Sequence, residues 1–412
     1  MMTKRAKAPF HIMTKPIGPK CNLDCKYCFY LEKESLWQKG ERYKMDRETL
    51  TTYIQNYISS QPSEEVTFAW QGGEPTLMGL DFFETVVKLQ KEYSDGKTIR
   101  NTLQTNGTLI DHKWGAFFHK NQFLIGVSID GPQKLHDFYR VNKSGSGSWI
   151  NVLKGIEILK KHDVEWNTLT CVHRGNSNKP QDVYRFLRGI GSTFMQFIPI
   201  VERKADSLSK KWGLHLGTPA ELNDKLDDDE NSPLTPWSVK PKDYGAFLCS
   251  IFDRWVKNDV GRIFIQINDV TLGKYLGQPN GICIFEETCG GALALEHDGS
   301  VYSCDHYVYP SFKLGNIKDT SMADLVDIPE QIQFGRNKKD CLPRQCIECP
   351  VKPLCNGGCP KQRFLHDKFG NPGLNYLCEG YYHYFTHTHP YMQKMKELYQ
   401  LGRPPSSIMG LL

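Results

Sequence analysis

Residues 18–30 read GPKCNLDCKYCFY and place Cys21, Cys25 and Cys28 directly after an apolar, β-branched run at 10–17. The chain has 14 cysteines, and most of them fall into tight groups. The first residues lack the apolar core of a signal peptide, and no stretch is long and apolar enough to span a bilayer. We therefore expect a cytoplasmic protein that does not enter a membrane. Clustered thiols in a reducing compartment indicate metal binding rather than disulfides.

This stretch belongs to an alternation of strand-like and helix-like runs that predicts an α/β fold with a parallel sheet. The expected strands are 10–17, 65–70, 99–106, 123–130, 165–172 and 193–200. The expected helices are 46–59, 80–93, 111–120, 148–162, 180–189 and 244–258. Asp46 and Asp111 stand where they can cap two of these helices. Six such units predict an open, partial (β/α)6 barrel with helices on its outer face.

Polar, glycine-rich loops directly follow four of the predicted strands. They are 18–30, QGGEPT at 71–76, TNG at 105–107 and SIDGP at 128–132. The carboxyl ends of barrel strands meet at one rim, where barrel active sites are built. We therefore expect these four loops to form a single site.

The cysteine group in 18–30 has three thiols rather than four. A [4Fe–4S] cluster usually has four cysteine ligands, so three would leave one iron open to another molecule. Zinc is the alternative. It fits less well, because no fourth ligand lies nearby at the usual spacing and His11 belongs to the preceding strand. The group therefore favours an iron–sulfur cluster with an open iron.

From about residue 263 the alternation gives way to short strands, glycines and cysteines, so the fold there must depend on metal more than on an apolar core. Cys171 and Cys249 fall in a predicted strand and helix, where buried inert thiols are the better interpretation. Cys341 lies close to the remaining cysteines and can replace one of them as a ligand. The remaining eight are enough for two fully ligated [4Fe–4S] clusters, with zinc ribbons as the alternative. They are Cys283, Cys289, Cys304, Cys346, Cys349, Cys355, Cys359 and Cys378.

Cys21-x3-Cys25-x2-Cys28-Phe29 resembles the signature of radical S-adenosylmethionine (SAM) enzymes, and Gly72-Gly73-Glu74-Pro75 resembles their second motif. The resemblance implies that SAM binds the open iron and is cleaved to a 5′-deoxyadenosyl radical. It also implies that Gly72, Gly73 and Glu74 contact the methionyl amino group through backbone and carboxylate. The further cofactor-contacting residues that it suggests are Tyr30, Gln71, Ser128 and Arg140. For Arg140, a surface salt bridge is the alternative.

The later cysteines resemble a SPASM domain, a two-cluster extension of peptide-modifying radical SAM enzymes. The resemblance assigns Cys283, Cys289, Cys304 and Cys359 to one cluster and Cys346, Cys349, Cys355 and Cys378 to the other. Three [4Fe–4S] clusters are then expected in all. Fully ligated clusters suit electron transfer, which favours a net two-electron oxidation. The predicted organisation is a barrel at 1–262, a SPASM domain at 263–380 and a helical tail at 381–412 that packs on the barrel.

Taken together, the motifs resemble those of anaerobic sulfatase-maturating enzymes from residue 10 to about 400, least of all within 201–241. The motifs are the first cysteine group with its Phe-Tyr pair, Gln-Gly-Gly-Glu-Pro, Gln-Thr-Asn-Gly, Ser-Ile-Asp-Gly-Pro and Ser-Cys-Asp-His. The resemblance implies oxygen-independent oxidation of a Cys or Ser, within a sulfatase Cys/Ser-x-Pro/Ala-x-Arg sequence, to Cα-formylglycine. The implied partners are an unfolded or nascent sulfatase polypeptide and a flavodoxin- or ferredoxin-like electron donor.

Asp305 directly follows the cluster-type cysteine Cys304. An acid held beside a cluster ligand has little freedom and can serve as a general base on the substrate. The alternative is an Asp that caps a turn. Two other functions remain open: a SPASM-type maturase of a different peptide, for example one that forms a thioether crosslink, and a non-catalytic iron–sulfur electron carrier.

The charged stretch 201–241 interrupts the pattern, and we interpret it as a solvated surface loop, with a lid or partner contact as the alternative. Gln196, Glu202 and Arg203, around the end of the last strand, are candidates for peptide binding. A net charge of +5 is small for 412 residues, so we expect no nucleic-acid partner.

Overall fold

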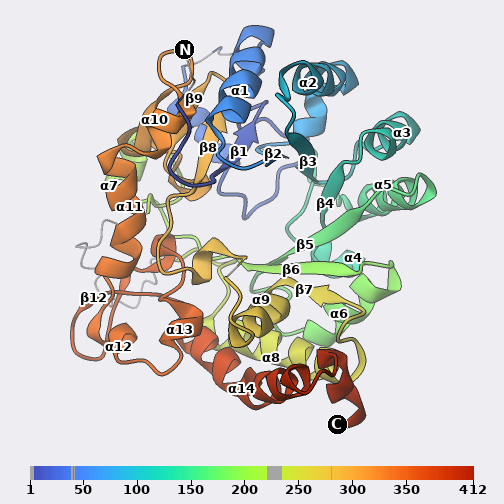
Figure 1. The fold of residues 1–412 in the computed structure, drawn as a ribbon, viewed down its shortest axis with the longest axis vertical. Helices are drawn as coiled ribbons and strands as arrows, with labels where there is room; N and C mark the ends of the chain where they lie inside the picture. Colours follow the sequence, from blue (N-terminus) through green and yellow to red (C-terminus); the bar gives the residue numbers. More distant parts are fainter. Residues whose placement is uncertain (1–3, 39, 41, 220–233, 280) are drawn as a thin grey trace.

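Six parallel strands in sequence order form the centre of the computed structural model, which describes residues 4–38, 40, 42–219, 234–279 and 281–412. The strands are β1 (His11–Lys15), β2 (Glu65–Trp70), β3 (Thr98–Thr105), β4 (Leu124–Ser128), β5 (Trp166–Val172) and β6 (Phe194–Pro199). Each pairs in parallel with the next. Figure 1 shows them as an arc that stays open, so the predicted partial barrel is confirmed.

Helices between these strands cover the outer face of the arc (Figure 1). They are α1 (Arg47–Ser60), α2 (Leu80–Tyr93), α3 (His112–Lys120), α5 (Trp149–Lys161) and α6 (Pro180–Gly189), with the short α4 (Gln133–His136) before α5. Asp46 caps α1 by accepting from Thr49 N, and Asp111 caps α3 by accepting from Lys113 N and Trp114 N. Both predicted caps are confirmed, and they fix where these helices begin.

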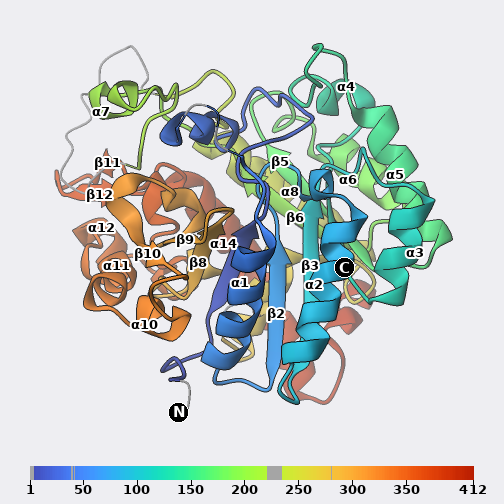
Figure 2. The same cartoon turned by 90° about the horizontal axis from the view of Figure 1, so that it is seen from above.

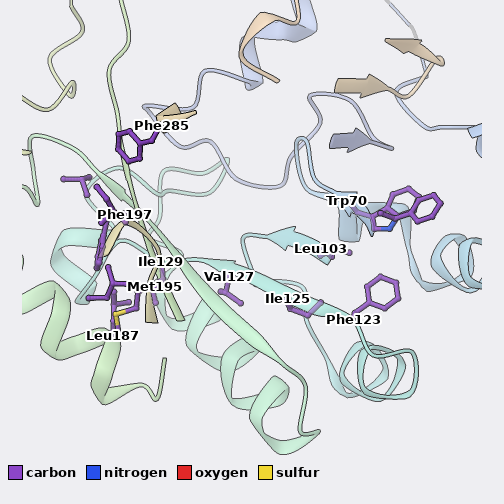
Figure 3. Packing of buried hydrophobic residues seen from close by; sticks show 14 of the residues in the cluster. Trp70, Leu103, Phe123, Ile125, Val127, Ile129, Leu187, Met195, Phe197 and Phe285 are labelled. Atoms are coloured by element: carbon purple, nitrogen blue, oxygen red, sulfur yellow. The ribbon is translucent and has the colours of Figure 1, made fainter. Parts of the chain in front are cut away.

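The core lies between the strands and this outer layer of helices. Parallel strands covered by helices are expected to be buried along most of their length, and β4 follows that rule, since its three central residues are buried. Figure 3 shows Ile125 and Val127 of β4 in the same apolar layer as Trp70 and Leu103. The ring of Phe83 on α2 lies 5.7 Å from that of Trp70. This packing holds the strand ends, and the loops that follow them, in fixed positions.

The sheet continues into the cysteine-rich half of the chain. β8 (Ala292–Glu296) pairs in parallel with β1, and β9 (Ser300–Tyr302) and β10 (Lys313–Asn316) follow in antiparallel order. At the other end of the sheet, β7 (Phe264–Ile265) pairs with β6. The predicted boundary at 262 is thus crossed by a sheet that brings the residues after β9 beside the end of β1.

Three helices pack together below the sheet in Figure 1: α8 (Pro241–Asn258), α9 (Gln266–Tyr275) and α14 (Cys378–Gln400). The sequence placed the start of the helical tail at 381, and Pro390, which removes a helical hydrogen bond, lies inside the observed helix. The structure differs, since α14 begins at Cys378 and buries Tyr381, Tyr384 and Phe385 at helical spacing. This burial outweighs the single lost bond, and α14 runs across the predicted boundary at 380.

Small elements make up the rest of the cysteine-rich half. The helices are α10 (Met322–Val326), α11 (Pro329–Asp340), α12 (Arg344–Ile347) and α13 (Lys352–Cys355), and the strands are β11 (Leu365–His366) and β12 (Pro372–Leu374). The short 3-10 helices are η1 (Leu31–Leu36), η2 (Pro75–Met78), η3 (Cys283–Phe285), η4 (Asp305–Tyr307), η5 (Pro310–Phe312), η6 (Pro360–Gln362) and η7 (Pro405–Gly410). Within the described residues, none of the helices combines the length and apolarity that a membrane span requires.

Candidate active site

The loop after β1 holds Cys21, Cys25 and Cys28 as partly buried free thiols. Burial raises the pKa of Cys21 to about 11, and burial also raises the pKa of Cys25 and of Cys28. The thiol of Cys25 lies close enough to the other two for their negative charges to raise its pKa further. These three thiols are therefore protonated in the absence of metal. Because they lie close together, they can bind a soft metal centre that replaces their protons.

The Gly-Gly-Glu-Pro loop after β2 docks directly on the cysteine loop. Gly73 N donates to Gly18 O at 2.9 Å, and Glu74 N donates to Lys20 O at 2.9 Å. A Cβ on Gly73 would lie 1.9 Å from Lys20 O, so this approach requires glycine. The contact of Gly72 and Gly73 with a methionyl amino group stays a prediction.

Glu74 joins a third loop to the first two. Its carboxylate is fully buried and accepts from Thr105 Oγ1 and Asn106 N, both at 2.8 Å, and from Thr76 Oγ1 at 2.6 Å. Asn106 in turn donates to Asn22 Oδ1 in the cysteine loop at 2.8 Å. Glu74 and its hydrogen-bond partners therefore link three loops to one another. The contact of Glu74 with a methionyl amino group stays a prediction.

The fourth loop, after β4, contributes Asp130. Tyr27 Oη in the cysteine loop donates to Asp130 Oδ2 at 2.5 Å, and Arg140 Nε donates to the same oxygen at 3.0 Å. Burial opposes the charge on Asp130, but Arg140 and His173 outweigh it and hold the pKa of this carboxyl well below its usual range. The prediction that the four loops meet at one rim is confirmed by these contacts.

Arg140 is buried, so the alternative of a surface salt bridge is wrong. Its charge lowers the pKa of Cys25 against the effect of burial, which places the guanidinium beside the cysteine group. Asp130 and Tyr27 were not among the residues predicted from the sequence. Their signals were the acid inside Ser-Ile-Asp-Gly-Pro and the tyrosine between two cysteines.

Gln71, Ser128 and Tyr30 also lie near the carboxyl ends of strands. Gln71 N donates to Thr14 O at 2.9 Å, and Ser128 Oγ accepts from Gln104 Nε2 at 3.0 Å. Tyr30 is buried and its hydroxyl donates to Glu296 at the end of β8. The structure brings the three residues to the rim, and their contact with SAM stays a prediction.

The eight later cysteines lie in two separate groups of four. One contains Cys283, Cys289, Cys304 and Cys359, and the other contains Cys346, Cys349, Cys355 and Cys378. Burial raises the pKa of Cys289 to about 11 and that of Cys355 to about 12, and thiols of the same group add to both shifts. These are the two sets that the SPASM resemblance assigned. Cys341 follows α11 as its C-terminal cap.

The spacing of these thiols bears on the zinc alternative. A tetrahedral zinc with bonds of about 2.3 Å holds two sulfur ligands about 3.8 Å apart. Among the described residues, no three of the eleven cysteines assigned to clusters bring their sulfur atoms within 4.8 Å of one another. The thiols of each group are therefore too far apart to bind a single ion together, but they are close enough to affect each other's pKa. This spacing suits a cluster of several metal ions. The residues therefore fit the iron–sulfur centres that the sequence predicts.

Asp305 faces the barrel rather than capping a turn. Its carboxylate forms an ion pair with Lys15 at the end of β1, whose side chain is only 3% exposed. Burial opposes ionisation of Asp305, but Lys15, His306 and Lys361 together outweigh it and lower the pKa of the carboxyl. Lys15 was not predicted from the sequence, although a lysine inside an otherwise apolar strand was a usable signal. The pair joins the first half of the chain to the segment that follows Cys304.

A second buried pair lies beside the first. Lys361, two residues after Cys359, donates to Glu202 Oε1 at 2.6 Å, and its ammonium lies 4.4 Å from the centroid of the Phe29 ring. The ring of Phe29 lies 5.3 Å from that of His306. Glu202, a predicted candidate for peptide binding, is thus brought to the space between the cysteine loop and Asp305. Gln196 lies within β6.

The described parts of 201–241 are packed rather than solvated. They contain α7 (Ser207–Lys211), and Glu32 Oε2 in η1 accepts from His215 N at 2.7 Å and from Leu216 N at 2.9 Å. The Trp212 ring lies 6.0 Å from that of Tyr309. Arg203 binds within this segment, since it donates to Thr218 O at 3.2 Å. Figure 2 shows α7 and the segment after β1 at the same end of the strands, so the described parts of 201–241 lie at the end of the sheet that carries the cysteine loop.

Comparisons with known proteins agree with this geometry. Residues 16–187 match the Radical SAM superfamily, and residues 283–350 match an iron–sulfur cluster-binding domain, SPASM. The serine-type anaerobic sulfatase-maturating enzyme of Bacteroides thetaiotaomicron is 46% identical over 98% of this chain and 95% of its own length. The cysteine-type enzyme of Clostridium perfringens is 32% identical over 93% of this chain and 97% of its own.

The fold is also similar to the solved structure of native anSMEcpe with bound AdoMet and Cp18Cys peptide. The TM-score is 0.80 at 32% identity, and the match covers 94% of this chain and 99% of the other. An open parallel sheet whose cysteine loop meets a Gly-Gly-Glu-Pro loop, followed by a SPASM region, defines a radical SAM enzyme that uses SAM and iron–sulfur centres. Within that class, the chain belongs to the anaerobic sulfatase-maturating enzymes.

Proposed function

We propose that this chain oxidises a serine or cysteine of a sulfatase Cys/Ser-x-Pro/Ala-x-Arg sequence to Cα-formylglycine without molecular oxygen. The observation that carries the proposal is the Asp305 carboxylate, held by Lys15 at the rim where the cysteine loop lies. Serine is the favoured target, because the serine-type relative is 46% identical and the cysteine-type relative is 32% identical.

The cofactors are assigned to residues as follows. Cys21, Cys25 and Cys28 would hold a cluster that leaves one iron for SAM, and the two groups of four cysteines would hold one [4Fe–4S] cluster each. SAM contacts are assigned to Tyr30, Gln71, Gly72, Gly73, Glu74, Ser128 and Arg140. When bound, these groups supply a radical that takes one hydrogen atom from the target Cβ and a centre that accepts the remaining electron.

The protein's own residues handle the proton. Loss of one hydrogen atom from Cβ, one proton from the hydroxyl and one electron converts a serine side chain to an aldehyde. Asp305 accepts that proton on its carboxylate, and Lys15 keeps the carboxylate charged and ready to accept it. For a cysteine target the same steps give a thioaldehyde, which water hydrolyses to the same product. The rim fixes the target carbon in place.

The surrounding residues are suited to exclude water and hold a peptide. Glu202 and Lys361 form a buried pair beside Phe29, and α7 covers the same end of the strands. An unfolded or nascent sulfatase chain is the proposed substrate, and a flavodoxin- or ferredoxin-like protein is the proposed electron donor. A cytoplasmic location is part of the same proposal.

The test is anaerobic turnover with a chemical reductant, SAM and two peptides that differ only in Ser or Cys at the target position. Mass spectrometry should show loss of two hydrogens from the serine peptide, and an aldehyde trap should label both products. Methionine and 5′-deoxyadenosine should appear in step. SAM cleavage with both peptides intact would instead support a maturase of another peptide, and no SAM cleavage would support an electron carrier.

A further inference from the structure

Two packed helices, α8 and α14, bring together three side chains that the proposed function does not use. Cys249 lies on α8, and His383 and His387 lie on α14. One ligand atom from each residue lies within 4.8 Å of the other two. Within the part of the chain that the structure describes, this is the one cluster of Cys, His or acidic side chains with that spacing.

The sequence register explains the convergence. His383 and His387 are four residues apart, so they lie on one face of α14, and Cys249 and Asp253 share one face of α8 in the same way. His387 Nε2 lies 2.6 Å from Asp253 Oδ1. A pair of histidines at this spacing on a helix is a recurring zinc-binding arrangement. Here it faces a thiol and a carboxylate of equal spacing on the neighbouring helix.

The two helices are held in this register by close packing. A Cβ on Gly380 would lie 2.3 Å from Pro241 O, and a Cβ on Gly245 would lie 2.8 Å from Gly380 Cα. Starting from this glycine contact, successive turns of α8 and α14 lie opposite each other. Gly245 lies opposite Gly380, Cys249 opposite His383, and Asp253 opposite His387. The donors are therefore brought together by the backbone and not by chance side-chain rotamers.

We propose that Cys249, His383 and His387 bind one zinc ion, with a water in the fourth position and Asp253 orienting the His387 ring. One thiolate, two imidazoles and a water make a common tetrahedral zinc set, and soft sulfur with imidazole nitrogen suits zinc better than magnesium or calcium. The short contact between Asp253 and His387 is that of a hydrogen bond, which is the usual way a carboxylate fixes a zinc-bound histidine.

The exposure of the two histidines agrees with this assignment. Burial raises the pKa of Cys249 to about 12, and the nearby Asp253 adds to that shift, so zinc has to displace a proton from the thiol. Zinc binding would exchange the thiol proton for the cation and release the proton to solvent. His383 is exposed and His387 is 31% exposed, which leaves the ion a path from solvent.

A zinc ion here would join α14 to α8 and stabilise the folded state over the unfolded one. Since α14 begins at Cys378, it would also secure one member of the second cysteine group. The site is independent of SAM chemistry, because none of its residues belongs to the cysteine loop or to the surroundings of Asp305.

The experiment uses the holoenzyme, with its clusters filled anaerobically so that their thiols are occupied. After zinc loading and removal of excess by a competing chelator, we expect one retained zinc per chain. X-ray absorption at the zinc edge should show one sulfur at about 2.3 Å and two nitrogens at about 2.0–2.1 Å from the zinc. Iron does not contribute to the signal at this edge. No retained zinc, or zinc bound by oxygen alone, would overturn the proposal.

Variants locate the site. His383→Ala, at an exposed position, should weaken zinc binding by more than the roughly 10–100-fold expected for Asp253→Asn, since it removes a ligand and not an orienting partner. His389→Ala is the matched control, because His389 is exposed on the same helix but pairs with Tyr275 Oη at 2.5 Å. Cys249→Ser should remove the sulfur signal. Equal zinc affinity in His383→Ala and His389→Ala would overturn the assignment even if a buried Cys249→Ser variant failed to fold.

Discussion

The cysteine loop of the barrel and the segment 341–378, which holds five of the eight later cysteines, position their thiols in different ways. The loop is pinned by backbone hydrogen bonds to Gly-Gly-Glu-Pro and lies over a sheet with a continuous apolar core. Between 341 and 378, the large apolar side chains that are buried are only Phe364 and Leu377, and most other buried residues are polar or glycine. The loop is therefore a preformed site, whereas the later groups depend on their metal for order.

Removing iron and sulfide should have the largest effect, and it tests whether the two regions differ in their dependence on metal. With the clusters extracted anaerobically by a chelator and an oxidant, residues 341–378 should lose nearly all amide protection, and β1 to β6 should keep theirs. Hydrogen exchange with mass spectrometry reports both regions in one sample. Equal loss in both regions would break the comparison, and reconstitution with iron and sulfide should restore the protection.

Replacing the three barrel cysteines together should abolish chemistry without unfolding the protein. The triple variant removes every protein ligand of the proposed SAM-binding cluster by combining Cys21→Ala, Cys25→Ala and Cys28→Ala. We expect no detectable 5′-deoxyadenosine, with iron retained in the two later groups and unchanged far-UV circular dichroism. Cys355→Ala is the matched comparison, because it should lower stability as well as activity. SAM cleavage by the triple variant would contradict the assignment.

Asp305→Asn should lower product formation by about 10²–10⁴-fold, the usual contribution of a positioned proton acceptor. The amide cannot take the proton, but it keeps nearly the same shape beside Lys15. Aldehyde yield is measured against 5′-deoxyadenosine, and we expect the two to become uncoupled. Asp319→Asn, at an exposed position, is the control. Full activity of Asp305→Asn would show that this carboxylate only holds β1 to the segment after β9.

Much of this architecture could be predicted from the sequence, and the failures have physical causes. Strands such as Glu65–Trp70 and helices such as Leu80–Tyr93 follow from local periodicity, and the cysteine groups follow from spacing and resemblance. Lys15, Asp130 and Lys361 were not found, because they contact Asp305, Tyr27 and Glu202, which are distant in sequence. The early start of α14 was missed for the same reason, since its aromatic face is buried on α8.

Gly73→Ala should have the smallest effect of these changes. It tests whether the cysteine loop is ordered before the metal binds. The added Cβ would lie 1.9 Å from Lys20 O, so the Gly-Gly-Glu-Pro loop or the cysteine loop must move. We expect a loss of about 1–3 kcal/mol in the free energy of unfolding, the usual cost of overpacking, measured by urea denaturation of the cluster-free protein. Gly189→Ala at the end of α6, where a Cβ meets nothing within 4 Å, should cost nothing. Because the cluster-free protein is used, a loss confined to Gly73→Ala would mean that the loop is already ordered before iron binds. Equal stability of the two variants would mean that the loop, like the later groups, is ordered only by its metal.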